Sequence, residues 1–195
     1  MEENNKPNYV LKFNDSTLQK IEDKNSKMKK AVAIIIAIIV IGSIIFGENL
    51  FLELSWTARI LLICLAVGFL FSGKREDVPN PAELQFYDDY LILYCPKKCY
   101  SKKNCRKEIF KMNYKDITNC KFLKNKYSKR FQIYGNGQAT WYNYDKDGNL
   151  SNQPDRDRFV EGGMIYFTTF LNPEIDFIKE IEEHSPIKVT VVENY

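Results

Sequence analysis

The residue types that most often do chemistry are sparse in this chain. The only histidine, His184, stands at the end of an expected C-terminal helix, where it faces solvent or the helix dipole. No Ser, Cys or Lys stands in a nucleophile motif, and no glycine pattern suits a phosphate group. We therefore expect a protein that is not an enzyme, with no catalytic residues and no cofactor.

One acidic segment imitates part of a calcium site. Residues 143–148, Asn-Tyr-Asp-Lys-Asp-Gly, match the first half of a calcium loop, and Leu150 occupies its hydrophobic position. The twelfth position, where a bidentate Glu is needed, is Pro154, and strands instead of helices are expected on both sides. The sequence therefore favours a hairpin turn over a metal site. The charges of the following segment 155–158, Asp-Arg-Asp-Arg, are expected to neutralise one another in a solvated loop.

The five cysteines raise the question of a metal site or of disulfides. Cys95, Cys99 and Cys105 follow one another at a spacing that is irregular for zinc, and no His is near them. Thiols stay reduced on the cytoplasmic side of a membrane, where we expect these cysteines to lie. We therefore expect these three, together with Cys64 and Cys120, to be free thiols, and we expect no metal.

Basic residues are concentrated in one part of the chain. Thirteen Lys or Arg and two acids, Glu108 and Asp116, lie between Lys97 and Arg130, whereas residues 131–195 hold five bases and eleven acids. Anionic lipid attracts each nearby Lys or Arg by roughly 1 kcal/mol, so this stretch favours a lipid-binding surface. A solvated charged surface is the alternative. The candidate residues for binding anionic lipid are Lys97, Lys98, Lys102, Lys103, Lys121, Lys124, Lys126, Lys129 and Arg130.

These candidate residues form two groups along the chain. The first group ends at Lys103, in the turn after an opening hairpin, and the second begins at Lys121, in a later loop between strands. In an up-and-down barrel the turns alternate between the two ends, so the groups can share a rim.

Two apolar segments explain why a membrane is expected. Isoleucines cover every face of residues 31–46, as in a helix solvated by lipid, and residues 54–71 are similarly apolar. The sequence predicts a transmembrane helical hairpin over 30–72, with spans at about 30–47 and 54–72. Buried helices of a large soluble core are the alternative. Because Lys and Arg flank the hairpin and not its connection, both termini of this multi-pass cell-membrane protein are expected in the cytoplasm.

The rest of the chain divides into three parts around this hairpin. Residues 1–29 form a polar cytoplasmic segment, in which residues 9–13 either add a strand to the soluble domain or lie on the membrane surface. Residues 73–82 form a linker, since two prolines preclude a continuous helix. Residues 83–195 form one soluble domain of ordinary size.

Short aromatic strands followed by one helix describe this soluble domain. The closing helix is expected at about 173–184, with Asn172 as its cap and Pro173 in its first turn. The pattern predicts a mainly-β domain, an antiparallel barrel or sheet that the helix closes. The expected strands lie at 84–87, 90–95, 108–114, 131–134, 139–144 and 163–170.

Three short motifs resemble a known family. These are Phe86-Tyr-Asp-Asp-Tyr-Leu-Ile-Leu, a strand that ends in Tyr114-Lys-Asp-Ile, and Phe167-Thr-Thr-Phe before the closing helix. Together they resemble the bacterial PH-like domains found behind two membrane spans, the YcxB-like type. The resemblance implies a PH-like barrel, mostly without an assigned activity, and no catalytic residues. The polar loop 145–161 and the strand-like tail 187–192 depart from it.

Two functions are compatible with these features. The preferred one is a membrane-anchored, non-enzymatic PH-like binding or scaffolding module at the cytoplasmic face, which contacts anionic membrane lipids or a protein partner. The alternative is a regulatory or accessory subunit of a larger membrane protein complex. A nucleic acid partner is not expected, because anionic lipid explains the basic strands more simply.

Overall fold

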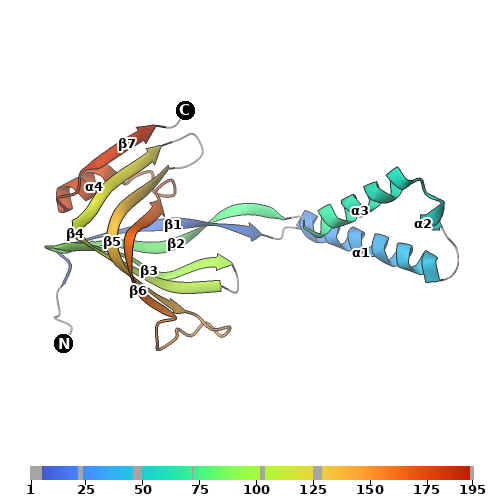
Figure 1. Ribbon diagram of the computed structural model, residues 1–195, viewed down its shortest axis with the longest axis horizontal. Coiled ribbons are helices and arrows are strands. Elements are labelled where there is room, and N and C mark those ends of the chain that lie inside the picture. The colour runs from blue at the N-terminus through green and yellow to red at the C-terminus, as the bar shows by residue number, and fades with distance from the viewer. Residues whose placement is uncertain are drawn as a thin grey trace. The chain divides into compact units, whose positions relative to one another are not determined.

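The computed structural model describes residues 6–21, 24–45, 50–71, 73–101, 104–124 and 129–193. These residues fall into two compact units, one formed by residues 1–18 with 77–195 and the other by residues 19–76 (Figure 1). The described elements, in chain order, are β1 (Tyr9–Ile21), α1 (Lys24–Ile45), α2 (Leu50–Glu53), α3 (Trp56–Leu70), β2 (Lys74–Phe86), β3 (Tyr90–Ser101), β4 (Asn104–Lys124), β5 (Lys129–Asn143), β6 (Arg156–Thr168), α4 (Phe177–His184) and β7 (Val189–Glu193).

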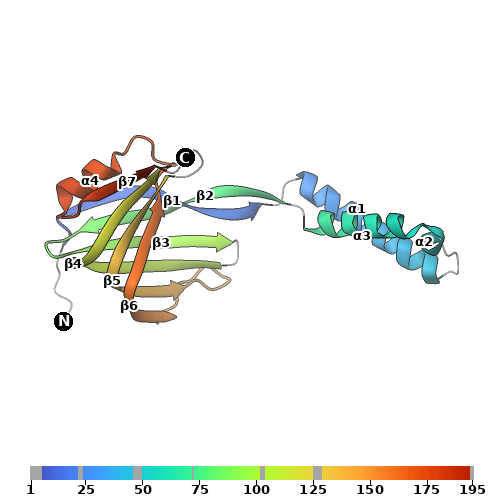
Figure 2. The ribbon, with the colours of Figure 1, turned by 45° about the horizontal axis from the view of Figure 1, so that its top comes forward.

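The first unit is built on one sheet of seven strands. Strands β1 to β6 lie next to one another in chain order, and the described pairs between β2 and β6 are antiparallel (Figure 2). Strand β7 pairs in parallel with the C-terminal half of β4. The N-terminal half of β4 pairs with β3 instead. The long strand β4 therefore connects both parts of the sheet.

Strand β4 bends where it exchanges these partners. Its register against β5 shifts between Met112 and Asn119, and two glycines of β5 lie against this bend. A Cβ atom at Gly135 would collide with the backbone oxygen of Asp116, and one at Gly137 would collide with that of Lys111. Glycine is needed at both positions because the two backbones approach so closely.

Alternating side chains build the core on one face of the sheet, which we call the inner face. Leu84, Leu91, Phe131 and Phe167 on this face are fully buried, as is Ile181 of α4. The rings of Phe131 and Phe167 stack at 5.3 Å, and Phe177 of α4 packs against both. Burial of each such side chain stabilises the fold by roughly 1.5–3 kcal/mol.

The N-terminal segment takes part in this unit. Leu11 and Phe13 are buried, because they occupy alternate inward positions of β1. Of the two alternatives for residues 9–13, the structure therefore shows the added strand. Strand β2 begins at Lys74 and includes most of the segment 73–82 that was expected to be a linker. Asn80 and Ala82 within it are buried.

The sheet is open, because no backbone ladder joins β6 to β1 among the described residues. The carboxylate of Asp15 in β1 spans this gap instead. Its Oδ1 accepts hydrogen bonds from the backbone N–H and the hydroxyl of Thr168, both at 2.8 Å. The sheet is thus strongly curled without being a closed barrel.

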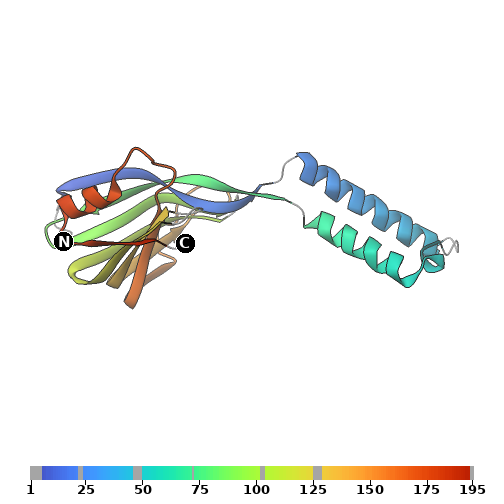
Figure 3. The same ribbon diagram turned by 90° about the horizontal axis from the view of Figure 1, so that it is seen from above.

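The second unit contains α1, α2 and α3. Helices α1 and α3 pack against each other and lie side by side in Figure 3. Within the described part of the chain, no helix is both long and apolar enough to cross a membrane. Helix α3 has 15 residues, about 22 Å, against the roughly 30 Å of a hydrocarbon core. The first seven residues of α1 include four lysines, so its uncharged part is similarly short.

These findings overturn the predicted fold class. The chain starts with strand β1, and the predicted transmembrane hairpin over 30–72, with spans at 30–47 and 54–72, is wrong. The multi-pass membrane location with both termini in the cytoplasm depended on these spans and is corrected with them. Residues 83–195 belong to an open seven-stranded sheet and not to the predicted PH-like barrel. Apolar composition suggested the spans, but the uninterrupted apolar helices are too short.

The closing helix begins later than expected. Helix α4 starts at Phe177, and its cap is Asp176, whose side chain accepts a hydrogen bond from the backbone N–H of Lys179 at 3.2 Å. Asn172 is buried and binds the backbone of Asn14, accepting from its N–H at 2.9 Å and donating to its carbonyl at 2.8 Å. Asn172 therefore connects the α4 region to β1 instead of capping a helix.

Candidate functional site

The predicted lipid-binding residues do not form one surface. Lys98 is buried and forms an ion pair with Asp15, so it is not available to a lipid. Lys102, Lys103 and Lys126 lie outside the described residues. Lys97 is exposed beside the ring of Tyr144, at 5.0 Å. The remaining candidates, Lys121, Lys124, Lys129 and Arg130, lie in the hairpin of β4 and β5.

The two predicted groups also do not share a rim. The first lies at the hairpin of β3 and β4, where Ser101 pairs with Asn104. The second lies at the hairpin of β4 and β5, where Lys124 pairs with Lys129. These hairpins are at opposite ends of β4, which is 21 residues long. Because they are consecutive hairpins, they lie at opposite ends of the strands.

A pocket on the inner face is a stronger candidate site. It lies over β4, β5 and β6 and has a volume of about 150 Å³. Its walls include Phe110, Met112, Val160 and Ile165. Space for the pocket exists because β5 presents small residues here, among them Ala139. We call it the inner pocket.

The inner pocket lies away from the helix that covers the core. Figure 1 shows α4 and β7 at one end of the sheet and the loop that precedes β6 at the other. Phe177 of α4 contacts Phe131 and Phe167 at the covered end. The inner pocket begins farther along the same strands, at positions such as Ala139 in β5 and Arg158 in β6.

Trp141 forms one wall of the inner pocket and is surrounded by cations. The guanidinium carbons of Arg106, Arg156 and Arg158 lie 4.5, 5.1 and 5.9 Å from its ring centroid. Trp141 pairs with Arg156 across β5 and β6, and Ala139 pairs with Arg158, so these side chains share the inner face. The Nε1 atom of Trp141 is buried without a hydrogen-bond partner.

Two buried acids of the first unit already have basic partners. Glu108, which pairs with Trp141 across β4 and β5, accepts hydrogen bonds from Arg106 and, at 2.6 Å, from the hydroxyl of Tyr100. Asp15 is paired with Lys98 at 2.7 Å. Burial and the hydrogen bond to Glu108 raise the pKa of Tyr100 to about 12, so this hydroxyl remains a donor at neutral pH.

Arg156 and Arg158 form no ion pair within the described part of the chain. The intervening Asp157 projects to the opposite face, where its carboxylate accepts hydrogen bonds from Gln138 and, at 2.9 Å, from Thr140. The expectation of a self-neutralising loop at 155–158 is therefore wrong, because β6 begins at Arg156 and separates the charges onto two faces. Two unpaired positive charges remain beside the inner pocket.

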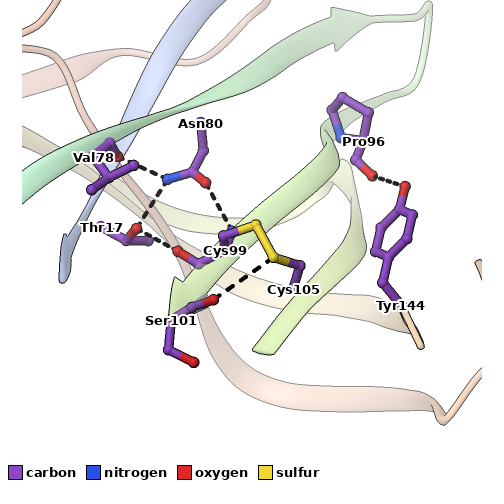
Figure 4. Close-up of a disulfide and its surroundings, with 8 residues drawn as sticks. All are labelled: Thr17, Val78, Asn80, Pro96, Cys99, Ser101, Cys105 and Tyr144. Atoms are coloured by element: carbon purple, nitrogen blue, oxygen red, sulfur yellow. Dashed lines mark hydrogen bonds between the residues drawn. A yellow bond between two sulfur atoms is a disulfide. The ribbon is translucent and has the colours of Figure 1, made fainter. Parts of the chain in front are cut away.

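A disulfide lies close to this ionic network. Cys99 and Cys105 are paired across β3 and β4, and their Cα atoms are 4.0 Å apart (Figure 4). Asn80 accepts a hydrogen bond from the backbone N–H of Cys99 at 2.8 Å, and Thr17 donates to its carbonyl at 2.6 Å. The neighbouring pair in the same register is Lys98 and Arg106. The disulfide therefore holds Lys98 and Arg106 in place, and these are the basic partners of Asp15 and Glu108.

The disulfide corrects the prediction that all the cysteines are free. Cys64, Cys95 and Cys120 are free thiols, but Cys99 and Cys105 are not. The prediction depended on a cytoplasmic location that the structure does not support. Burial raises the pKa of Cys95 and that of Cys120 to about 12, so both thiols stay protonated at neutral pH.

The calcium-like segment forms a turn, as predicted. Oδ1 of Asp145 accepts hydrogen bonds from the backbone N–H of Asp147 at 2.9 Å and of Asn149 at 2.8 Å. These donors lower the pKa of Asp145. Gly148 has a φ of 86°, which favours glycine. The described residues contain no group of three His, Cys, Asp or Glu side chains that could hold a metal ion.

Comparisons with known proteins identify no relative. No family model matches the chain, and neither a curated protein nor a solved structure matches it. The resemblance to YcxB-like PH-like proteins therefore stays a prediction. The geometry of the inner pocket is the basis for a function.

Proposed function

We propose that this protein is a non-enzymatic binding module whose inner pocket takes a ligand with an anionic group next to an apolar group. One observation carries the proposal. Trp141 lines an apolar pocket beside the unpaired guanidinium groups of Arg156 and Arg158, and its buried Nε1–H donor has no acceptor.

The size and walls of the pocket define the apolar part of the ligand. Phe110, Met112, Val160 and Ile165 offer apolar surface around a space of about 150 Å³. Apolar cavities of about 150 Å³ bind molecules the size of benzene. A phenyl ring or a short acyl segment therefore matches the pocket, whereas a larger ring system does not.

The hydrogen-bond donors beside the inner pocket define the anionic part of the ligand. Arginine presents a planar set of N–H donors that suits carboxylate and phosphate oxygens, and such charge-assisted hydrogen bonds are stronger than neutral ones. A buried donor without a partner costs roughly 1–3 kcal/mol. A ligand oxygen that accepts from Trp141 would remove this cost while Arg158 neutralises its charge. Free aromatic acids and the headgroup region of anionic lipids share this chemistry.

Fluorescence of Trp141 tests the proposal. The chain has two tryptophans, so Trp56→Phe leaves Trp141 as the reporter. We expect phenyl phosphate and benzoate to change its emission saturably, because both combine a phenyl ring with an anion. Benzyl alcohol and benzylamine should bind at least tenfold more weakly, since they have the same ring without the negative charge. Octyl phosphate in the same titration distinguishes a lipid-like ligand from an aromatic acid.

A variant that fills the pocket provides the matched comparison. Ala139→Leu adds apolar atoms inside the inner pocket and should abolish the response to phenyl phosphate. The proposal is wrong if the emission does not saturate with any of the anions. It is also wrong if benzyl alcohol binds as tightly as phenyl phosphate.

A further inference from the structure

Three charged side chains meet in the interior of the first unit. Lys98 is 3% exposed, and Asp15 and Glu108 are each 1% exposed. They come from β3, β1 and β4, respectively. Buried ionised groups are costly unless they are paired, and anion binding at the inner pocket does not require this arrangement.

The geometry of the three side chains brings an amine against a carboxyl group. Nζ of Lys98 lies 2.7 Å from Oδ2 of Asp15 and 3.9 Å from Oε2 of Glu108. The other oxygen of Glu108, Oε1, is held by Tyr100 and Arg106. These two partners orient the carboxylate so that its Oε2 remains on the side of Lys98.

The second oxygen of Asp15 is surrounded by donors. Oδ1 accepts hydrogen bonds from the backbone N–H of Ser16, the backbone N–H of Thr168 and the hydroxyl of Thr168, all at 2.8 Å. Fixed donors around one oxygen of a carboxyl group stabilise the negative charge that collects there when a nucleophile attacks the carbon. Asp15 therefore has an oxyanion site on one oxygen and an amine at the other.

The geometry points to an intramolecular amide bond between Nζ of Lys98 and Cγ of Asp15, formed with Glu108 as the proton carrier. The overall reaction converts an ammonium and a carboxylate into an amide and one water. It needs no oxidant, reductant or further reactant.

A proton moves from Nζ through Glu108 to Oδ2, Nζ then bonds to Cγ, and the negative charge collects on Oδ1 beside its three donors. Glu108 takes a second proton from Nζ and delivers it to Oδ2. The bond between Cγ and Oδ2 breaks, and this oxygen leaves as water with both protons, while the third proton stays on the amide nitrogen.

The surroundings favour this reaction over hydrolysis of its product. The rings of Tyr166 and Tyr100 lie 5.3 and 5.9 Å from Nζ of Lys98, and the three reacting groups are almost fully shielded from solvent. Holding amine and carboxyl together supplies a high effective concentration. Burial alone would lower the pKa of Lys98, but Asp15, Cys95 and Glu108 raise it, so the neutral amine is a minor species and the reaction is slow.

The bond would join β1 to β3 beside the disulfide of β3 and β4. Residues 15 and 98 are 83 positions apart, so the amide would close a large loop, whereas the disulfide closes a short one. Cys99, which follows Lys98, is also held by hydrogen bonds from Thr17 and to Asn80 (Figure 4). Strand β1 would then stay attached even when the sheet unfolds.

Mass spectrometry of the full chain tests the inference. After reduction and alkylation of the cysteines, aged protein should have a mass one water lower than that of the alkylated chain. Digestion should release a branched peptide that contains both Asp15 and Lys98. Lys98→Arg retains the positive charge but cannot form this bond, so it should show the full mass, whereas Lys97→Arg should behave like the unchanged protein.

The role of Glu108 has its own readout. Glu108→Gln retains the shape of the side chain but cannot carry protons, so the water loss should slow by at least tenfold. The inference is overturned if aged protein keeps its full mass. It is also overturned if the lost water belongs to a peptide without the Lys98 branch, or if Glu108→Gln reacts at the unchanged rate.

Discussion

The space above the inner face is filled differently at its two ends. At one end, Phe177 and Ile181 of α4 cover the sheet and fill the space above Phe131 and Phe167. At the other end no helix covers the sheet among the described residues, and small side chains such as Ala139 leave a pocket of about 150 Å³. One end is therefore completed by the chain itself, whereas the other has room for a ligand.

The forces that hold the two ends also differ. Aromatic packing dominates the covered end, where neighbouring ring centroids are 5.3 to 6.0 Å apart. At the open end, the disulfide between Cys99 and Cys105 joins β3 to β4, and a buried ionic network joins Lys98 of β3 to Asp15 of β1 and Glu108 of β4. Packing tolerates changes of pH and redox state, but ionic groups and disulfides do not.

The largest expected effect is at the covered end. Phe177→Ala should lower the free energy of unfolding by about 3–5 kcal/mol, because it leaves a cavity against Phe131 and Phe167. Urea denaturation measures this change. Phe159→Ala is the matched control, because Phe159 is 60% exposed and its removal should cost less than about 0.5 kcal/mol. Equal effects of the two substitutions would contradict the packing described for this end.

The disulfide should give the next largest effect. Cys99→Ser combined with Cys105→Ser should lower the free energy of unfolding by roughly 2 kcal/mol, since the crosslink restricts a short loop of the unfolded chain. Reductant should destabilise the unchanged protein by a similar amount and leave the double variant unaffected. A reductant effect of the same size on the double variant would show that another site is responsible.

Charge at the open end should affect binding more than folding. Arg158→Gln should weaken phenyl phosphate binding by about tenfold, because one charge-assisted hydrogen bond is worth about 1.5–3 kcal/mol. Lys129→Gln removes the same charge at the far hairpin of β4 and β5 and should leave the affinity unchanged. Equal losses in both variants would mean that net charge, and not the inner pocket, attracts the anion.

The smallest expected effect concerns the link between α4 and β7. The backbone N–H of Val189 donates to Glu182 at 2.9 Å and lowers the pKa of Glu182 below its ordinary value of 4.5. A lowered pKa in the folded state stabilises the protein above the unfolded pKa, and this contribution disappears as the pH falls through the folded value. Glu182→Gln should therefore be slightly destabilising at neutral pH and neutral in effect at about pH 3. Urea denaturation of this variant and of the unchanged protein at both pH values measures the difference.

Local patterns predicted much of the sheet. The alternation in residues 90–95 matches the start of β3. Residues 131–134 and 139–144 were expected to be two strands, but they belong to the single strand β5, which runs through Gly135 and Gly137 and ends at Asn143. The apolar stripe of the last helix predicted α4, although Asp176 and not Asn172 is its cap. Asn172 binds β1, which is 158 residues away, and no local pattern contains this contact.

The functional residues were harder to predict because tertiary contacts decide their roles. Lys98 stands in a basic stretch and was expected on the surface, but a register shift between Cys95 and Lys98 turns it inward toward Asp15. The disulfide was missed because a cytoplasmic location was assumed. Its signal was available, since Cys99 and Cys105 flank a turn between two strands.

The inner pocket also left a signal in the sequence. Gly137 and Ala139, which line the inner pocket, are small residues at alternate positions of β5 before Trp141. Arg156 and Arg158 alternate in the same way on β6. The register that places Trp141 opposite Arg156 could not be derived from either pattern alone.

The N–H signal of the Trp141 indole reports whether an anion binds in the inner pocket. In Trp56→Phe protein this single indole signal can be followed by nitrogen–proton correlation NMR. We predict that phenyl phosphate moves it downfield saturably, because Nε1–H gains an acceptor, and that benzyl alcohol does not. A signal that stays in place while phenyl phosphate binds would contradict the assignment of the inner pocket as the ligand site.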